Sequence, residues 1–328
     1  MNSNEELNAF ARIFLKLTPE IGSEILPFSG RGSDRNYFRF RWGSGNSVIL
    51  VHYERSRSEN VCFADIAQYL NEAGIPVPRI LLHDPIRCFI IMEDLGDTDL
   101  WALRDTPWET RKVLYEKTLT AVHRLHSITE TDFPSRRITL MDSFGPDLYR
   151  WERNYFREHF VEGLCGIELD TDSDSHLEEE LSQLAERLGS GERVLVHRDL
   201  QSKNVMIYHD EPFLIDFQGM RFGSSFYDLG SLLYDPYVDL TDDNRLELLT
   251  CYFELSRPNI EWKGFQRMFY EASVQRLIQA LGAYGYLGRV RGLKHYLDYV
   301  PSALANLRSA AGNAASLPML LETCDKYL

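Results

Sequence analysis

Three polar side chains within residues 193–217 have the types needed to bind a metal ion and to accept a proton. Asp199 lies in the stretch His-Arg-Asp-Leu-Gln-Ser-Lys-Asn, which ends at Asn204, and Asp216 follows a short distance later. An amide oxygen beside a carboxylate suits a hard cation such as Mg²⁺, which prefers oxygen ligands and keeps part of its shell for water and phosphate. A further carboxylate near that cation, such as Asp199, can accept a proton from a hydroxyl group.

Two short apolar runs explain how Asn204 and Asp216 would come together. Residues 205–208 and 213–216 have the pattern of strands, and residues 209–212 between them predict a turn. Pairing Tyr208 with Phe213 sets Val205 opposite Asp216. Asn204 and Asp216 would therefore leave the open end of one hairpin side by side.

The elements before this stretch fall into a mixed part and a helical part. Residues 37–42 and 47–51 predict strands around a Gly-Ser-Gly-Asn turn, and residues 58–73 predict a helix that ends at Gly74. A short apolar strand follows at residues 88–92. We therefore expect a small sheet-bearing lobe over residues 1–95, with a junction near residues 93–97.

The remainder, residues 96–328, is predicted to be a larger and mostly helical lobe. Two capping boxes, Thr106 to Glu109 and Ser175 to Glu178, indicate helix starts. The expected helices cover residues 106–126, 175–188, 241–255, 265–284 and 299–311.

Composition excludes several classes of protein. The chain has 328 residues, 44% of them hydrophobic, and a formal net charge of −14. This balance disfavours binding to nucleic acid or to an anionic membrane surface, because both depend on clustered positive charge. The five cysteines show no metal-ligand spacing and cannot all pair within the chain, which favours reduced thiols and a cytoplasmic location.

In its motifs the chain resembles the protein-kinase-like superfamily, and within it the aminoglycoside phosphotransferase-like branch. It is most similar there to the bacterial kinases of the anomeric hydroxyl of N-acetylmuramate and N-acetylglucosamine. The matching stretches include residues 32–39, 71–79, 197–204, 215–218 and 227–235. The resemblance implies a two-lobed protein-kinase-like α+β fold and a cytoplasmic enzyme that transfers the γ-phosphoryl group of ATP, with Mg²⁺, to a hydroxyl of a small molecule.

The same resemblance assigns roles to residues of the loop and its surroundings. Asp199 would be the catalytic base, and Asn204 and Asp216 would bind the metal ion. His197 and Asp228 would be structural, since Asp228 stands where the superfamily has an aspartate that anchors the catalytic loop.

A nucleotide site is implied in the first lobe. Gly32, Ser33, Asp34 and Arg35 would wrap the phosphates, while Glu93 and Leu95 would lie at the hinge whose backbone holds adenine. The lysine that protein kinases carry on the third strand is missing from residues 48–53. Its role would pass to Arg35, Arg39 or His52, or nucleotide affinity would be reduced.

The acceptor is predicted to contact the helix at residues 265–284. Glu271 and Gln275 lie one turn apart, away from its apolar face, and would either bond sugar hydroxyls or form a solvated stripe. Arg276 would either be paired in the interior or reach an acidic substrate group. We expect an amino sugar as the small-molecule acceptor. The alternatives are an aminoglycoside or choline-type kinase of the same fold, or an inert pseudokinase that binds nucleotide.

Overall fold

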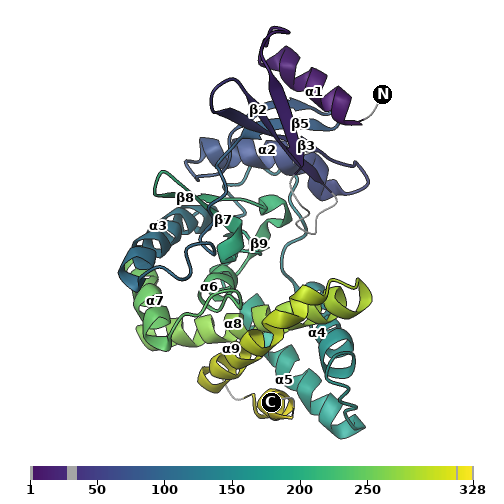
Figure 1. Ribbon diagram of the computed structural model, residues 1–328. Helices are drawn as coiled ribbons and strands as arrows, with labels where there is room; N and C mark the ends of the chain where they lie inside the picture. The colour runs from purple at the N-terminus through teal and green to yellow at the C-terminus, as the bar shows by residue number, and fades with distance from the viewer. Residues whose placement is uncertain (1–2, 28–34, 315–316, 327–328) are drawn as a thin grey trace. The chain divides into compact units, whose positions relative to one another are not determined.

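In the computed structural model, residues 3–27, 35–314 and 317–326 are described, and the chain forms two compact units (Figure 1). The first unit contains residues 1–98 together with 134–141 and 206–219. The second contains residues 99–133, 142–205 and 220–328. Residues 206–219 thus pack with the N-terminal part of the chain, although in sequence they follow the loop of residues 197–204, which belongs to the second unit.

The first unit is built on a five-stranded antiparallel sheet with strand order β1-β2-β3-β5-β4. A second, two-stranded sheet pairs β7 with β8. The elements are α1 (Ser3–Phe14), β1 (Ser23–Pro27), β2 (Asn36–Trp42), β3 (Asn46–His52), α2 (Ser58–Glu72), β4 (Ile80–Asp84), β5 (Phe89–Glu93), β7 (Val205–Tyr208), which begins at the unit boundary, β8 (Glu211–Leu214) and the 3₁₀ turn η3 (Phe217–Gly219).

Alternation along the central strands creates the core of this sheet. Phe40, Leu50 and Ile91 come from three neighbouring strands and form one buried cluster with Leu7 and Ala11 of α1. Successive residues of a strand point to opposite faces, so these side chains form one apolar face, which α1 covers. The predicted strands around residues 43–46, and the helix ending before Gly74, are confirmed.

The second unit is mostly helical, and its only strands in the described residues are β6 and β9, which pair with each other. Its elements are α3 (Trp108–His126), α4 (Pro146–Phe156), the π-helix η1 (Arg157–Glu162), α5 (Thr171–Gly189), β6 (Val194–Val196), η2 (Ser202–Asn204), β9 (Arg221–Gly223), α6 (Ser225–Leu233), α7 (Asp242–Ser256), α8 (Trp262–Gly285), the π-helix η4 (Tyr286–Val290), η5 (Lys294–Tyr299), α9 (Val300–Asn313) and α10 (Pro318–Asp325).

Helix α8 is the central element of the second unit, and from Glu271 to Gly282 each of its residues is buried. Glycines allow its neighbours to approach closely. A Cβ atom at Gly230 of α6 would lie 2.8 Å from the Cα atom of Ser273 in α8. A Cβ atom at Gly285 would lie 2.2 Å from the carbonyl oxygen of His159 in η1. These contacts bring backbone against backbone, which only glycine permits.

Two predicted capping boxes are wrong. Helix α5 begins at Thr171 rather than at Ser175, because the carboxylate of Asp170 accepts the backbone N–H of Ser173 at 2.8 Å. Helix α3 begins at Trp108 without a side-chain cap, since the hydroxyl of Thr106 donates to the carbonyl of Leu103 in the preceding turn.

A hairpin forms at residues 205–214, but its predicted register is wrong, because the turn is shorter and Asp216 lies beyond the end of β8 rather than opposite Val205. His209 and Asp210 both have positive φ, 51° and 59°, as a two-residue type I′ turn requires. Strand β8 therefore starts at Glu211 and includes Pro212. A two-stranded sheet consists of edges only, so the missing N–H of proline is tolerated there.

Two properties of the described residues bear on the cellular setting. None of their helices combines the length and the apolar character needed to span a bilayer. All five cysteines lie in this part of the chain and are free thiols.

We expect the Gly285→Ala change to destabilise the protein by about 1–3 kcal/mol, because the added methyl group meets the His159 carbonyl and α8 must move. Gly264→Ala in the same helix is the matched control, since nothing lies within 4 Å of its Cβ position. That change should leave stability unchanged or raise it by up to about 1 kcal/mol. Urea unfolding measures both, and equal midpoints for the two variants would contradict the close packing.

Candidate active site

The loop that carries Asp199 is held at its start by a buried carboxylate. Asp228, in the first turn of α6, accepts the backbone N–H groups of His197 at 2.7 Å and Arg198 at 2.8 Å. Its Oδ2 also lies 3.0 Å from Nε2 of His126, whose Nδ1 is 2.7 Å from the hydroxyl of Tyr252. Arg198 has a φ of 78°, a strained value for a residue with a side chain, and these bonds hold it there.

A second aspartate, which the sequence reasoning missed, fixes the other end of the loop. Asp235 follows the C-cap of α6 and accepts both the backbone N–H (2.7 Å) and the hydroxyl (2.5 Å) of Ser202. Burial raises the pKa of Asp235, while the bonds from Ser202 and the backbone N–H of Tyr237 oppose that rise. Asp235 ends the stretch 227–235 that resembles the family, but that resemblance assigned a role to Asp228 alone.

Asp199 lies between two guanidinium groups. Its Oδ1 is 3.4 Å from Arg276 and its Oδ2 is 3.5 Å from Arg198. These distances are longer than those of a strong charge-assisted hydrogen bond, and the side chain is 33% exposed, so its oxygens can still accept a hydroxyl proton. Burial alone would raise the pKa of Asp199, but Arg198, Arg276 and other nearby positive groups outweigh it and hold the pKa below its ordinary value. Asp199 is therefore ionised at neutral pH.

Asn204 is oriented by its own loop. Its Nδ2 donates to the carbonyl of Asp199 at 2.9 Å. The amide nitrogen is thus engaged within the loop, and the amide oxygen is the end that can ligate a cation.

Asp216 belongs to the first unit and is held in an unusual backbone conformation. Its φ is 63°, in the left-handed region, and its Oδ1 accepts a hydrogen bond from Nε2 of Gln218 at 2.8 Å. Gln218 stands where protein kinases have glycine, and here its amide orients the carboxylate. Strand β9 begins at Arg221, five residues after Asp216, so this turn is not followed by a long activation segment of the kind that protein kinases have.

Phe217 links this turn to Arg35 through helix α2. The rings of Phe217 and Phe63 are stacked, with centroids 4.8 Å apart and planes at 7°. The guanidinium of Arg35 lies 4.9 Å from the centre of the Phe63 ring, and its Nε donates to Asn60 at 2.8 Å. Gly32, Ser33 and Asp34, which were predicted to wrap phosphates, lie outside the described residues.

The segment after β5 is fastened by Arg39. Its guanidinium forms ion pairs with Asp94 and Asp97, each at 2.7 Å, and donates to the carbonyl of Gly96. Glu93 is bonded to Arg79 at 3.0 Å, and Leu95 is buried.

The three residues predicted to contact the acceptor point in different directions. Arg276 approaches Asp199 and also donates to Ser231 at 3.1 Å. Glu271 is buried and pairs with Arg187 at 2.9 Å, while Gln275 donates to Glu152 at 2.7 Å. The structure thus brings one of the three beside the catalytic loop.

Glu152 is a buried carboxylate that sequence reasoning did not find. It accepts hydrogen bonds from Tyr227 (2.9 Å) and Gln275, and burial raises its pKa. No motif surrounds it in the sequence. It joins α4, α6 and α8 behind the loop.

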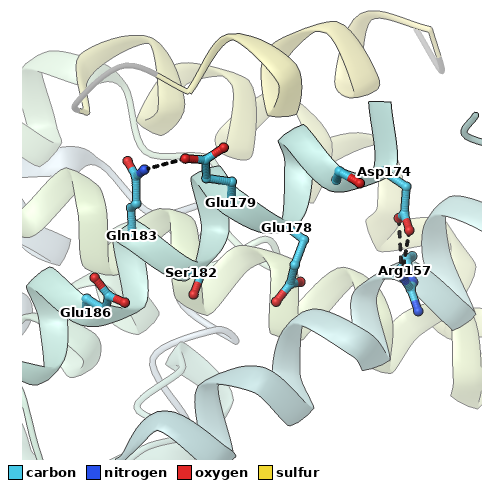
Figure 2. Close-up of a pocket in the computed structure, with 8 residues that line it drawn as sticks. Arg157, Asp174, Glu178, Glu179, Ser182, Gln183 and Glu186 are labelled. Carbon is cyan, nitrogen blue, oxygen red and sulfur yellow. Dashed lines mark hydrogen bonds and ion pairs between the residues drawn. The ribbon is translucent and has the colours of Figure 1, made fainter. Parts of the chain in front are cut away.

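Residues 168–180 include seven acidic side chains, three of which, Asp174, Glu178 and Glu179, line a pocket on α5 (Figure 2). Asp174 pairs with Arg157 at 3.0 Å and Glu178 with Arg153 at 2.6 Å. Glu180 accepts the N–H groups of Met319 and Leu320 at the start of α10. Asp174, Glu178 and Glu180 thus bond to neighbouring helices, while Asp170 caps its own helix and Glu179 bonds to Gln183 within α5.

A model of the phosphotransferase enzyme family matches residues 24–258, which is most of the chain. The chain belongs to this family. It is a small-molecule kinase, and the predicted two-lobed α+β fold is confirmed. A relative from Neisseria meningitidis serogroup B, named N-acetylmuramate/N-acetylglucosamine kinase, is 28% identical over 303 residues, 90% of this chain and 88% of the relative.

Several solved structures share the fold of this chain. The gentamicin complex of APH(2")-IIa matches with a TM-score of 0.61 and 15% identity, over 93% of this chain and 97% of that one. The choline kinase LicA from Streptococcus pneumoniae matches with a TM-score of 0.62 and 14% identity, over 94% of this chain and 100% of that one. At these identities the likeness concerns the fold.

We expect Arg276→Gln to move the acid limb of the kcat/KM profile to higher pH. We expect the native limb to reflect protonation of Asp199, whose pKa Arg276 helps to depress. Removing that charge raises the pKa, so the carboxylate is lost at a higher pH as the solution is acidified. Arg276→Lys keeps a positive charge and should shift the limb less. If Arg276→Gln is active and its acid limb stays at the native pH, that limb reflects the protonation of a group other than Asp199.

Proposed function

We propose that this kinase uses ATP and Mg²⁺ to phosphorylate the anomeric hydroxyl of an N-acetylated amino sugar. The family and fold imply a nucleotide and a divalent metal ion. The observation that carries the chemistry is the ionised, reachable carboxylate of Asp199. The acceptor class is supported by the Neisseria relative, whose name specifies two N-acetylated sugars and which aligns over nearly the whole chain.

An anomeric hydroxyl suits this base. It is more acidic than other sugar hydroxyls, so proton transfer to a carboxylate of low pKa meets a smaller mismatch. Arg198 and Arg276 keep Asp199 in its charged form, and the remaining requirement is to hold the hydroxyl in line with the γ-phosphate.

Asn204 and Asp216 are the proposed metal ligands. They flank the β7–β8 hairpin, Asn204 directly before it and Asp216 two residues after it. One neutral and one charged oxygen ligand leave Mg²⁺ with coordination positions for phosphate and water. When bound, the ion neutralises charge on the phosphates.

We assign the phosphate-binding role of the absent strand lysine to Arg35. Arg39 is already paired with the carboxylates of Asp94 and Asp97, and the ring of His52 packs against Phe89 at 5.1 Å. Arg35 is also bonded, but to the neutral side chains of Asn60 and Tyr37. Arg35 directly follows the stretch 32–34, which we propose wraps the phosphates. The backbone at Glu93 and Leu95 would hold adenine.

For the acceptor, we propose Arg276 as a neighbour of the bound sugar. Glu271 and Gln275 would support the pocket through Arg187 and Glu152. We also propose a cytoplasmic location, in keeping with five free thiols.

Replacing Arg35 by alanine should raise the KM for ATP by about 10- to 100-fold, the value of a lost charge-assisted hydrogen bond to phosphate. The KM for the acceptor should change little. Arg41→Ala is the control, because Arg41 is an exposed arginine of β2, the strand that follows Arg35, and the variant should behave like the native enzyme. If Arg35→Ala binds ATP normally, another cation neutralises the phosphates.

The function is tested by offering N-acetylmuramate, N-acetylglucosamine and their 1-O-methyl glycosides with ATP and Mg²⁺, and by measuring ADP release. The free sugars should react and the blocked glycosides should not, because no anomeric hydroxyl remains. Asp199→Asn should lower turnover by about 10²- to 10⁴-fold.

Three results would contradict this assignment. Equal turnover of free and blocked sugars would place the reacting hydroxyl elsewhere on the ring. A preference for kanamycin or choline would favour the alternative acceptor classes. No turnover of any acceptor, with ATP bound, would favour an inert nucleotide-binding module.

A further inference from the structure

The ammonium group of Lys203 lies inside a cage of three aromatic rings. Lys203 immediately precedes Asn204 in the catalytic loop. Its Nζ is 3.8 Å from the ring centre of Tyr237, 4.7 Å from that of Tyr299 and 4.8 Å from that of Trp101. It also donates a hydrogen bond to the hydroxyl of Tyr299 at 3.1 Å.

The cage is built from three separate stretches of the second unit, and each is fixed. The backbone N–H of Trp101 donates to the carbonyl of Ser202 at 3.3 Å. The backbone N–H of Tyr237 donates to Asp235, the same carboxylate that holds the catalytic loop. The rings of Tyr237 and Tyr299 meet edge to face, with centroids 4.4 Å apart. The rings are therefore arranged in advance around the cation.

Three rings within about 6 Å of one positive centre form the arrangement by which proteins recognise alkylammonium ions. The Trp101 ring also receives the guanidinium of Arg104, 4.0 Å from its centre. The Tyr237 and Tyr299 rings, in contrast, lie 3.8 and 4.7 Å from the Lys203 ammonium. We propose that Trp101, Tyr237 and Tyr299 form a site for small alkylammonium cations, which Lys203 occupies and thereby closes to acceptors of the choline class.

This inference extends the proposed function on one point, the choice of acceptor. N-acetylated sugars carry no cation and have no need of such a site, so its occupation by Lys203 costs them nothing. A choline-type acceptor approaching the catalytic loop would find this cage filled. Binding to the cage can be measured without turnover, so the sugar-kinase assignment and this inference can fail separately.

The test removes the lysine side chain and offers tetramethylammonium to the emptied cage. Lys203→Ala should bind tetramethylammonium with a millimolar dissociation constant by calorimetric titration, whereas the native protein should show no binding in the same range. Choline should bind Lys203→Ala at least 10-fold more tightly than 3,3-dimethylbutanol, its uncharged isostere, because about 1.4 kcal/mol of cation–π attraction corresponds to that factor.

Two control variants distinguish the effect of removing the lysine charge from the effect of emptying the cage. Lys203→Met fills the cage with an uncharged chain and should not bind tetramethylammonium. Lys203→Ala combined with Trp101→Leu should lose the binding gained by Lys203→Ala. A folded Lys203→Ala protein that ignores tetramethylammonium, or that binds the uncharged isostere equally well, would overturn the proposal.

A second measurement keeps the proposal open to refutation if Lys203→Ala does not fold. Reductive methylation of the native protein with ¹³C-formaldehyde labels its lysines. The dimethyl signal of Lys203, assigned by its loss in Lys203→Arg, should be shifted upfield by the ring currents of the cage. The shift should decrease in Tyr237→Leu. A signal at the ordinary position in the native protein would show that the ammonium lies outside the cage.

Discussion

The catalytic loop depends on two buried carboxylates that accept hydrogen bonds from its backbone. Asp228 binds the N–H groups of His197 and Arg198, and Asp235 binds Ser202. Bonds from N–H to a buried carboxylate are strong, and losing the acceptor would leave several donors unsatisfied. The strained φ of Arg198 persists because these bonds over-determine the backbone.

Helix α6 sets the distance between the two carboxylates, and its position in turn depends on α8. Gly230 lets α6 approach Ser273 so closely that a methyl group would not fit. The same approach brings Arg276 of α8 within 3.4 Å of Asp199. A packing requirement between two helices thus determines the electrostatic environment of Asp199. Gly230 therefore affects both the packing of α6 on α8 and the distance between Arg276 and Asp199.

The parts of the site that could be predicted are those encoded in neighbouring residues. Asp199, Asn204 and Asp216 occur within one short stretch, and the resemblance to kinases rests on their spacing. Asp235 and Glu152 were missed because their partners, Ser202, Tyr227 and Gln275, are distant in sequence. Only the folded chain shows that such isolated acids are buried and bonded.

The same distinction applies to the fold. Periodicity located six helices and the main strands but missed α4, α6 and α10, and the helix ends depended on single hydrogen bonds. Glu271 and Gln275 looked like a polar stripe on α8, but this helix is surrounded by α4, α5, α6 and α9, so both are buried with partners from other helices. A helix enclosed on all sides buries its polar residues as well, and periodicity does not reveal that.

Gln218 has a consequence for control of the enzyme. Protein kinases can be switched off by turning the metal-binding aspartate away, a movement that the adjacent glycine makes easy. In this chain the amide of Gln218 holds Asp216, and Phe217 is stacked on Phe63. There is also no activation segment before β9 that a modifying enzyme could address. The bond from Gln218 and the stacked ring of Phe217 therefore favour a single orientation of Asp216, so its proposed use as a metal ligand requires no rearrangement of this turn.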